Sequence, residues 1–152
     1  NPKDADAWYH LADVYERTAS YREAADALNK VVALDPGRGS AYLKLGTVYN
    51  RLGRHQEAVT NFQKATKFFP KDPVLHNNLA VSYGKLGKLN EEIKLLEKAI
   101  SLRPHYATAR YNLAMAFLKQ GKRDQALKQY AELEKFDAGT ASALKKEIEK
   151  NR

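Results

Sequence analysis

The chain repeats itself every 34 residues, and a period of this length restricts it to a small set of folds. Each unit carries one leucine of this series, and a proline with the same period lies nine residues before each leucine. A small residue follows each leucine, and an aromatic residue lies four positions after it. The series are Leu11, Leu45, Leu79 and Leu113; Pro2, Pro36, Pro70 and Pro104; Ala12, Gly46, Ala80 and Ala114; and Tyr15, Tyr49, Tyr83 and Phe117. Coincident series over four units predict stacked copies of one structural unit.

Apolar residues within each unit follow helical spacing. In the first unit they form two groups, which are Trp8, Leu11, Ala12 and Tyr15, and then Ala24, Leu28, Val31 and Val32. Gly53, Gly87 and Gly121 separate the two groups in the later units, with Ala19 at this position in the first. A residue without Cβ can end a helix with positive φ, and a proline stops the helix before it. Each unit is therefore predicted to be a helical hairpin.

This pattern resembles the tetratricopeptide repeat, W-x2-L-G-x2-Y followed by A-x3-F and P over 34 residues. The second unit matches it through Tyr42, Leu45, Gly46, Tyr49, Ala58, Phe62, Ala65 and Pro70. The resemblance implies an all-α, right-handed superhelical solenoid, a single array over residues 1–152. Its four helix-turn-helix units are expected at residues 5–38, 39–72, 73–106 and 107–140. We expect looser packing in the third unit, where Glu92 replaces the alanine at positions 24, 58 and 126.

The two ends of the array differ in the pattern. Residues 141–152 place Ala141, Leu144 and Ile148 on one helical face, which predicts a helix that caps the fourth unit. Asn1-Pro2 matches the end of a preceding unit. We therefore expect the chain to be a fragment of a longer protein with earlier repeats. We also expect self-association through the apolar face of the first helix.

The resemblance implies that the first helix of each unit lines a concave peptide-binding groove. Asn78 and Asn112 occupy equivalent positions one repeat apart, and stacked amides can hold a peptide backbone in register. A basic row would favour acidic partners. The predicted binding residues are Tyr9, His10, Lys44, Arg51, Asn77, Asn78, Lys85, Tyr111, Asn112, Met115 and Lys119. The alternative is that the amides are merely solvated, and that the lysines stabilise helix ends through the helix dipole.

Composition excludes several classes of site. The sequence has no cysteine, which rules out disulfides, thiolate zinc sites and cysteine nucleophiles and fits a cytoplasmic protein. No two of the four histidines share the i, i+4 spacing of a helical metal site, and no apolar stretch approaches 18 residues. The loop at residues 36–40 lacks the lysine of a phosphate-binding loop. We therefore predict a protein without catalytic activity, cofactor, metal or membrane span.

Three functions compete. The first is a protein–protein interaction scaffold that binds an extended peptide, with an acidic partner favoured by the net charge of +8. The second is the substrate-recruiting arm of a larger enzyme such as a glycosyltransferase, because the inner asparagines resemble those of O-GlcNAc transferase repeats. Nucleic-acid binding ranks third, since the basic residues are spread over several faces. The carboxylate clamp of chaperone-binding repeats is rejected, because its cationic pair is missing.

Overall fold

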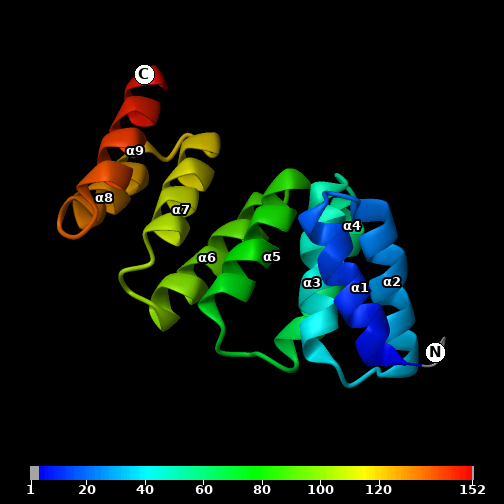
Figure 1. The fold of residues 1–152 in the computed structure, drawn as a ribbon. Helices are drawn as coiled ribbons and strands as arrows, with labels where there is room; N and C mark the ends of the chain where they lie inside the picture. The colour runs from blue at the N-terminus through cyan, green and yellow to red at the C-terminus, as the bar shows by residue number, and fades with distance from the viewer. Residues whose placement is uncertain (1–3, 152) are drawn as a thin grey trace. The chain divides into compact units, whose positions relative to one another are not determined.

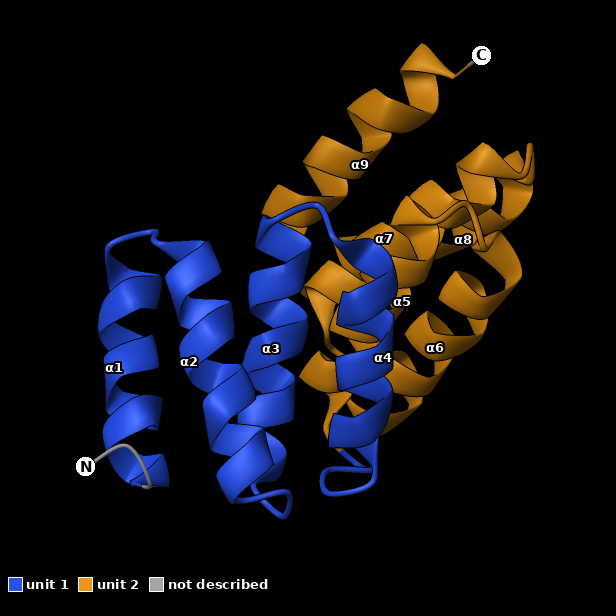
Figure 2. Cartoon of the chain, turned by 90° about the vertical axis from the view of Figure 1, so that its right-hand side faces the viewer, with its two compact units in different colours: residues 1–71 blue, residues 72–152 orange. Residues whose placement is uncertain are grey.

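The computed structural model describes residues 4–151, and every regular element in this range is an α-helix. The helices are α1 (Ala5–Arg17), α2 (Tyr21–Leu34), α3 (Gly39–Arg51), α4 (His55–Thr66), α5 (Pro73–Lys85), α6 (Leu89–Leu102), α7 (Ala107–Lys119), α8 (Arg123–Glu134) and α9 (Ala138–Lys150) (Figure 1). The first eight pack as four consecutive antiparallel pairs, α1–α2, α3–α4, α5–α6 and α7–α8. The chain divides into two compact units, residues 1–71 and 72–152 (Figure 2), and each is described by itself.

The turn inside each pair has the same geometry. Gly53, Gly87 and Gly121 have φ of 73°, 75° and 73°, and Ala19 at the same position has φ of 56°. The N–H of the next residue donates to the carbonyl of the aromatic position five residues earlier, as in Arg54 N to Tyr49 O at 2.8 Å. This bond closes the helix in a Schellman motif. The prediction of positive φ at the glycines is confirmed, and it extends to Ala19.

The first unit comprises α1 to α4, and α2 packs against α3 between the two pairs. Its core holds Leu28, Leu45 and Phe62, which are fully buried. Gly46 permits the close approach of α3 and α4, since a Cβ there would lie 2.5 Å from the Phe62 ring. The small residue after the repeat leucine is therefore a packing requirement.

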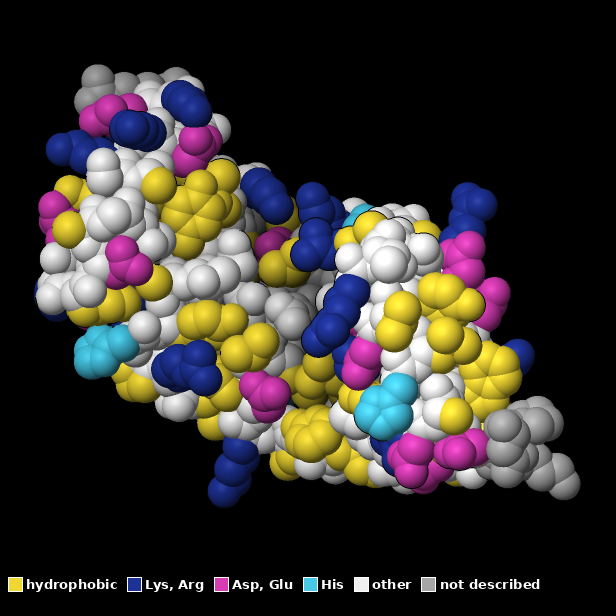
Figure 3. Space-filling model, in the orientation of Figure 1, with side chains coloured by type: hydrophobic (Ala, Val, Ile, Leu, Met, Phe, Trp, Pro, Cys, Tyr) yellow, Lys and Arg dark blue, Asp and Glu magenta, His cyan; other side chains and the backbone are white. Residues whose placement is uncertain are grey.

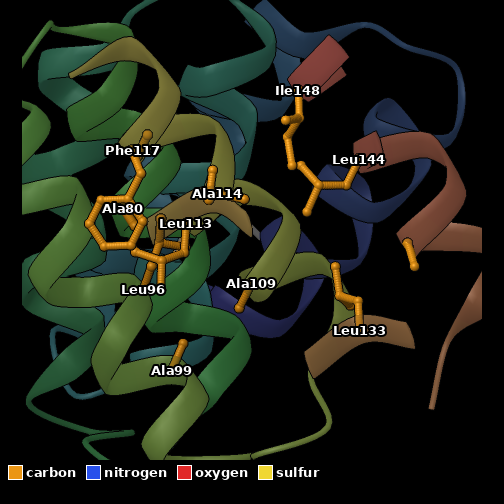
Figure 4. Packing of buried hydrophobic residues seen from close by; sticks show 13 residues of the cluster. Ala80, Leu96, Ala99, Ala109, Leu113, Ala114, Phe117, Leu133, Leu144 and Ile148 are labelled. Atoms are coloured by element: carbon orange, nitrogen blue, oxygen red, sulfur yellow. The ribbon is translucent and has the colours of Figure 1, made fainter. Parts of the chain in front are cut away.

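The second unit comprises α5 to α9, and α9 packs against both α7 and α8. Its core includes the buried side chains of Leu96, Leu113, Leu133, Leu144 and Ile148 (Figure 4). Ala141 is buried together with Leu144 and Ile148, which agrees with the apolar face predicted for the terminal helix.

The terminal helix begins earlier than the sequence pattern indicated. It starts at Ala138 rather than at residue 141, because the side chain of Asp137 accepts a hydrogen bond from Thr140 N at 2.9 Å. An aspartate at this position satisfies a backbone N–H of the first turn that has no partner within the helix. Ala138 lies 34 residues after Pro104, at the place where a further proline of the series would end the fourth unit, and it is instead the first residue of α9.

Candidate functional site

Binding residues predicted in the first unit lie on α1 and α3. The Lys44 ammonium is already paired, with Nζ 2.7 Å from Asp13 Oδ1 and 2.8 Å from Glu16 Oε1. Burial alone would lower the pKa of Lys44, but the hydrogen bonds with Asp13 and Glu16 outweigh it and raise that pKa. Lys44 Nζ also lies 5.7 Å from the centre of the Tyr9 ring. Lys44 therefore ties the two helices together, whereas His10 and Arg51 are exposed.

The asparagines of the second unit form a chain of amides between α5 and α7. Asn112 Nδ2 donates to Asn77 Oδ1 at 3.0 Å, and Asn77 Nδ2 donates to Asn78 Oδ1 at 3.4 Å. Asn77 is only 4% exposed, so the expectation that it faces a groove is corrected. Its amide stabilises the packing of α5 against α7, whereas Asn78 and Asn112 remain half-buried.

A cleft of about 200 Å³ in the second unit collects four of the predicted binding residues. They are Lys85 on α5 and Asn112, Met115 and Lys119 on α7. These helices are the first helices of consecutive repeats, and α5 contacts α7 directly. Val81 and Gly84 of α5 and Glu92 of α6 complete the lining. The cleft thus combines a hydrophobic wall, an amide, two ammonium groups and one carboxylate, whereas Tyr111 and Asn78 do not line it.

Comparison with known proteins decides the family. Three models of this repeat match consecutive stretches of the chain, described as "Tetratricopeptide repeat" at residues 5–48, "TPR repeat" at 46–87 and "Tetratricopeptide repeat" at 85–147. The chain belongs to the tetratricopeptide repeat family. Its fold is therefore one that serves protein–protein interaction. A search of curated proteins finds no match.

Solved tetratricopeptide repeat structures agree with this fold. A crystal structure of MamA is 27% identical in sequence and superposes with a TM-score of 0.84. The superposition covers 88% of this chain and 74% of the MamA chain. YrrB, described as a TPR protein with an unusual peptide-binding site, is 25% identical with a TM-score of 0.79. That comparison covers all of this chain and 81% of YrrB. MamA from Desulfovibrio magneticus RS-1 is 18% identical with a TM-score of 0.87, over 90% and 77% of the two chains.

Glu92 is the charged residue of the cleft that the sequence analysis did not assign to binding. It occupies the alanine position of the tetratricopeptide motif and is 5% exposed. Its carboxyl lies over Gly84, where a Cβ would come within 2.4 Å of Glu92 Cδ. Glycine at position 84 therefore accommodates the side chain that we expected to loosen the third pair. Gly84 stands where the other units have Glu16, Asn50 and Leu118. Two unusual residues in the third unit, Gly84 and Glu92, were therefore the available sequence signal.

The electrostatics of the cleft centre on this carboxylate. Glu92 Oε2 has no hydrogen-bond partner within the described structure, and the nearest cation, Lys119 Nζ, lies 4.0 Å away. Burial raises the pKa of the Glu92 carboxyl, and the charges of Lys119 and Lys85 oppose that rise. The site consequently holds a hydrogen-bond acceptor whose charge is only partly compensated.

Metal sites and membrane-spanning helices are absent from the described residues. From residue 4 to residue 151, no group of three histidine, cysteine, aspartate or glutamate side chains could hold a metal ion. No helix within that range has the length and hydropathy to cross a bilayer. Basic, acidic and hydrophobic side chains are interspersed on the face in Figure 3. A larger cleft of about 430 Å³ in the first unit, lined by Asn29, Tyr49 and Arg54 among others, contains none of the predicted binding residues. The cleft of the second unit contains four of them and is therefore the stronger candidate for ligand recognition.

Proposed function

We propose that this chain is a non-catalytic scaffold that binds an extended segment of a partner protein, and that the cleft of the second unit is a contact point. The observation that carries this proposal is the convergence of Lys85, Asn112, Met115 and Lys119 from two consecutive repeats. Met115 and Val81 offer apolar contact, while the ammonium groups favour acidic residues beside the bound side chain. The similarity to YrrB, a TPR protein with a peptide-binding site, supports peptide binding as a use of this fold.

The binding chemistry is expected to be modest in strength. One small cleft with a few polar groups gives an affinity in the micromolar range, which corresponds to about −8 kcal/mol. Asn112 can contribute its carbonyl oxygen, because its Nδ2 is hydrogen bonded to Asn77. Contacts along an extended backbone would add to this one.

The test uses a display library of random 12-residue peptides, from which binders are selected and then labelled for fluorescence anisotropy. We expect Met115→Ala and Lys85→Ala to weaken a selected peptide several-fold while the helical circular dichroism signal is kept. Lys94→Ala is the matched control, because Lys94 is an exposed lysine outside the cleft. Equal affinity in all three variants would remove the cleft from the proposal.

A salt titration of the same complex separates peptide recognition from recognition of a polyanion. Neutralising many phosphates produces a steep linear fall of log K with log salt, whereas a cleft with two lysines produces a shallow one. If no peptide of the library binds but a nucleic acid does, with a steep fall of log K with log salt, the scaffold function itself would be contradicted.

A further inference from the structure

Glu92 is a destabilising residue at its position in the third helix pair. A buried carboxylate oxygen without a hydrogen-bond donor, as Glu92 Oε2 is here, costs free energy because it has lost its water. The other three pairs avoid this cost, since Ala24, Ala58 and Ala126 occupy the same position and are fully buried. Gly84, which lies directly beneath the carboxyl near the end of α5, leaves the space that this side chain occupies. An unfavourable buried residue that places an acceptor in the wall of a cleft indicates a ligand.

The position of this acceptor defines what can reach it. Glu92 lines the cleft together with Asn112 and Met115, and its Oε2 lacks a hydrogen-bond donor. Lys119 Nζ at 4.0 Å is beyond hydrogen-bond distance, and its side chain is 51% exposed. A volume of about 200 Å³ is smaller than a typical small-molecule pocket, so the cleft suits a single side chain.

The charges around Glu92 select among side chains. A lysine or arginine would meet two ammonium groups, those of Lys85 and Lys119, for one carboxylate. An aspartate or glutamate would be attracted by the two ammonium groups, but it would place a second carboxylate directly against that of Glu92, which disfavours the ionised form of one of them. A primary amide avoids both conflicts, because its NH2 group donates two hydrogen bonds and its carbonyl oxygen accepts one.

We propose that the cleft binds the primary amide side chain of a glutamine or asparagine in an extended partner, with Glu92 accepting from its NH2 group. The carbonyl oxygen of that amide then accepts from the Lys119 ammonium, and its methylene groups contact Met115 and Val81. This inference rests on the proposed function and narrows its ligand to one kind of side chain.

Met115 provides a direct reporter, because it is the only methionine in the sequence and it lines the cleft. Protein labelled with ¹³C at the methionine methyl is titrated at pH 7 with the N-acetyl methylamides of glutamine, glutamate and lysine. We expect a saturable shift of the methyl signal with the glutamine compound. The affinity for each of the other two compounds should be at least about five-fold weaker. Equal responses to all three compounds, or none to the glutamine compound, would overturn the proposal.

Glu92→Gln isolates the carboxylate at constant size. We expect it to weaken the glutamine compound about five-fold, because a hydrogen bond to a charged group is stronger than one to a neutral group. Glu91→Gln is the matched control, being the same change at the adjacent exposed glutamate. Undiminished binding by the Glu92 variant would contradict the assignment. The compound preference of the unaltered protein tests the proposal independently of any variant.

The outcomes also separate this inference from the proposed function. A selected 12-residue peptide that shifts the Met115 methyl, combined with no preference for the glutamine compound, refutes only the amide assignment. Selected peptides that leave the Met115 methyl unshifted refute the cleft as a contact point, and the amide assignment with it. Tighter binding of the glutamate compound as the pH falls would replace the amide with a carboxylic acid and so overturn the proposal.

Discussion

Glycine makes room for a larger side chain in both the α3–α4 pair and the α5–α6 pair, but the two side chains behave differently. Gly46 lies against the ring of Phe62, and a Cβ there would meet ring atoms at 2.5 to 2.8 Å. Gly84 lies against the carboxyl of Glu92, and a Cβ there would meet its terminal atoms at 2.4 to 2.5 Å. The first pair of residues fills the core, whereas the second places a buried carboxylate in the wall of a cleft.

This comparison separates a glycine needed for stability from one needed for a site. Phe62 is rigid, fully buried and held by apolar neighbours, so it has nowhere to move. Glu92 meets Gly84 only with the end of a flexible side chain, which can rotate. The same substitution at the two glycines should therefore give opposite patterns of stability and binding.

The largest effect is expected from Gly46→Ala. Alanine favours the helix, but the new methyl group overlaps the Phe62 ring, and overpacking of this kind costs about 1–3 kcal/mol. Thermal unfolding followed by circular dichroism measures the loss. Adding Phe62→Leu should restore most of it, because the first and third pairs combine alanine with leucine at these positions, as in Ala12 with Leu28. A single variant as stable as the unaltered chain would show that the ring shifts freely.

The helices and their turns could be predicted from the sequence, because both depend on local signals repeated in every unit. Helical spacing fixed the pairs, and glycine at the αL position fixed the turns. The boundary of α9 was less accurate, since the capping role of Asp137 depends on a single side chain rather than on the repeat.

The candidate site could be predicted only in part. Lys85, Asn112, Met115 and Lys119, which were grouped by their positions in the repeat, line one cleft, because equivalent positions on stacked helices lie on one side. Position in the repeat could not show that Asn77 is buried, which depends on the reach of Asn112 from the next repeat. Nor could it assign Glu92 to the cleft, because a departure from a motif does not reveal which neighbour accommodates it.

A smaller effect of opposite sign is expected from Glu92→Gln. Removing the buried charge should stabilise the chain at neutral pH by about 1 kcal/mol, the lower end of the cost of an unsatisfied buried polar group. Thermal unfolding measures the gain, and Glu91→Gln should leave the midpoint unchanged, since that side chain is exposed. A destabilised Glu92 variant would indicate that the carboxylate has donors within the fold, and the contrast with Phe62 would disappear.

The pH dependence of that gain tests its electrostatic origin. Burial raises the folded-state pKa of Glu92 above its ordinary value of 4.5, so the folded chain holds this proton more tightly than the unfolded chain. The resulting stabilisation is present below pH 4.5 and is lost as the pH rises through the raised pKa. The advantage of Glu92→Gln should therefore be smallest in acid and reach a plateau above the raised pKa. An advantage that does not change with pH would assign it to packing.

The smallest change in stability is expected from Gly84→Ala, together with a clear loss of binding. The gain in helix propensity is smaller than the roughly 1 kcal/mol of a helix interior, because Gly84 is the second-last residue of α5, and displacement of the Glu92 carboxyl offsets it. The net change should therefore stay below about 0.5 kcal/mol. In a Glu92→Ala background the offset is removed, and the same substitution should then stabilise the chain by the full amount. The displaced carboxyl no longer occupies its place in the cleft, so the Met115 methyl should lose its saturable response to the glutamine compound. A Gly84 variant as destabilised as the Gly46 variant would mean that Glu92 is held as rigidly as Phe62, and that the two pairs are equivalent after all.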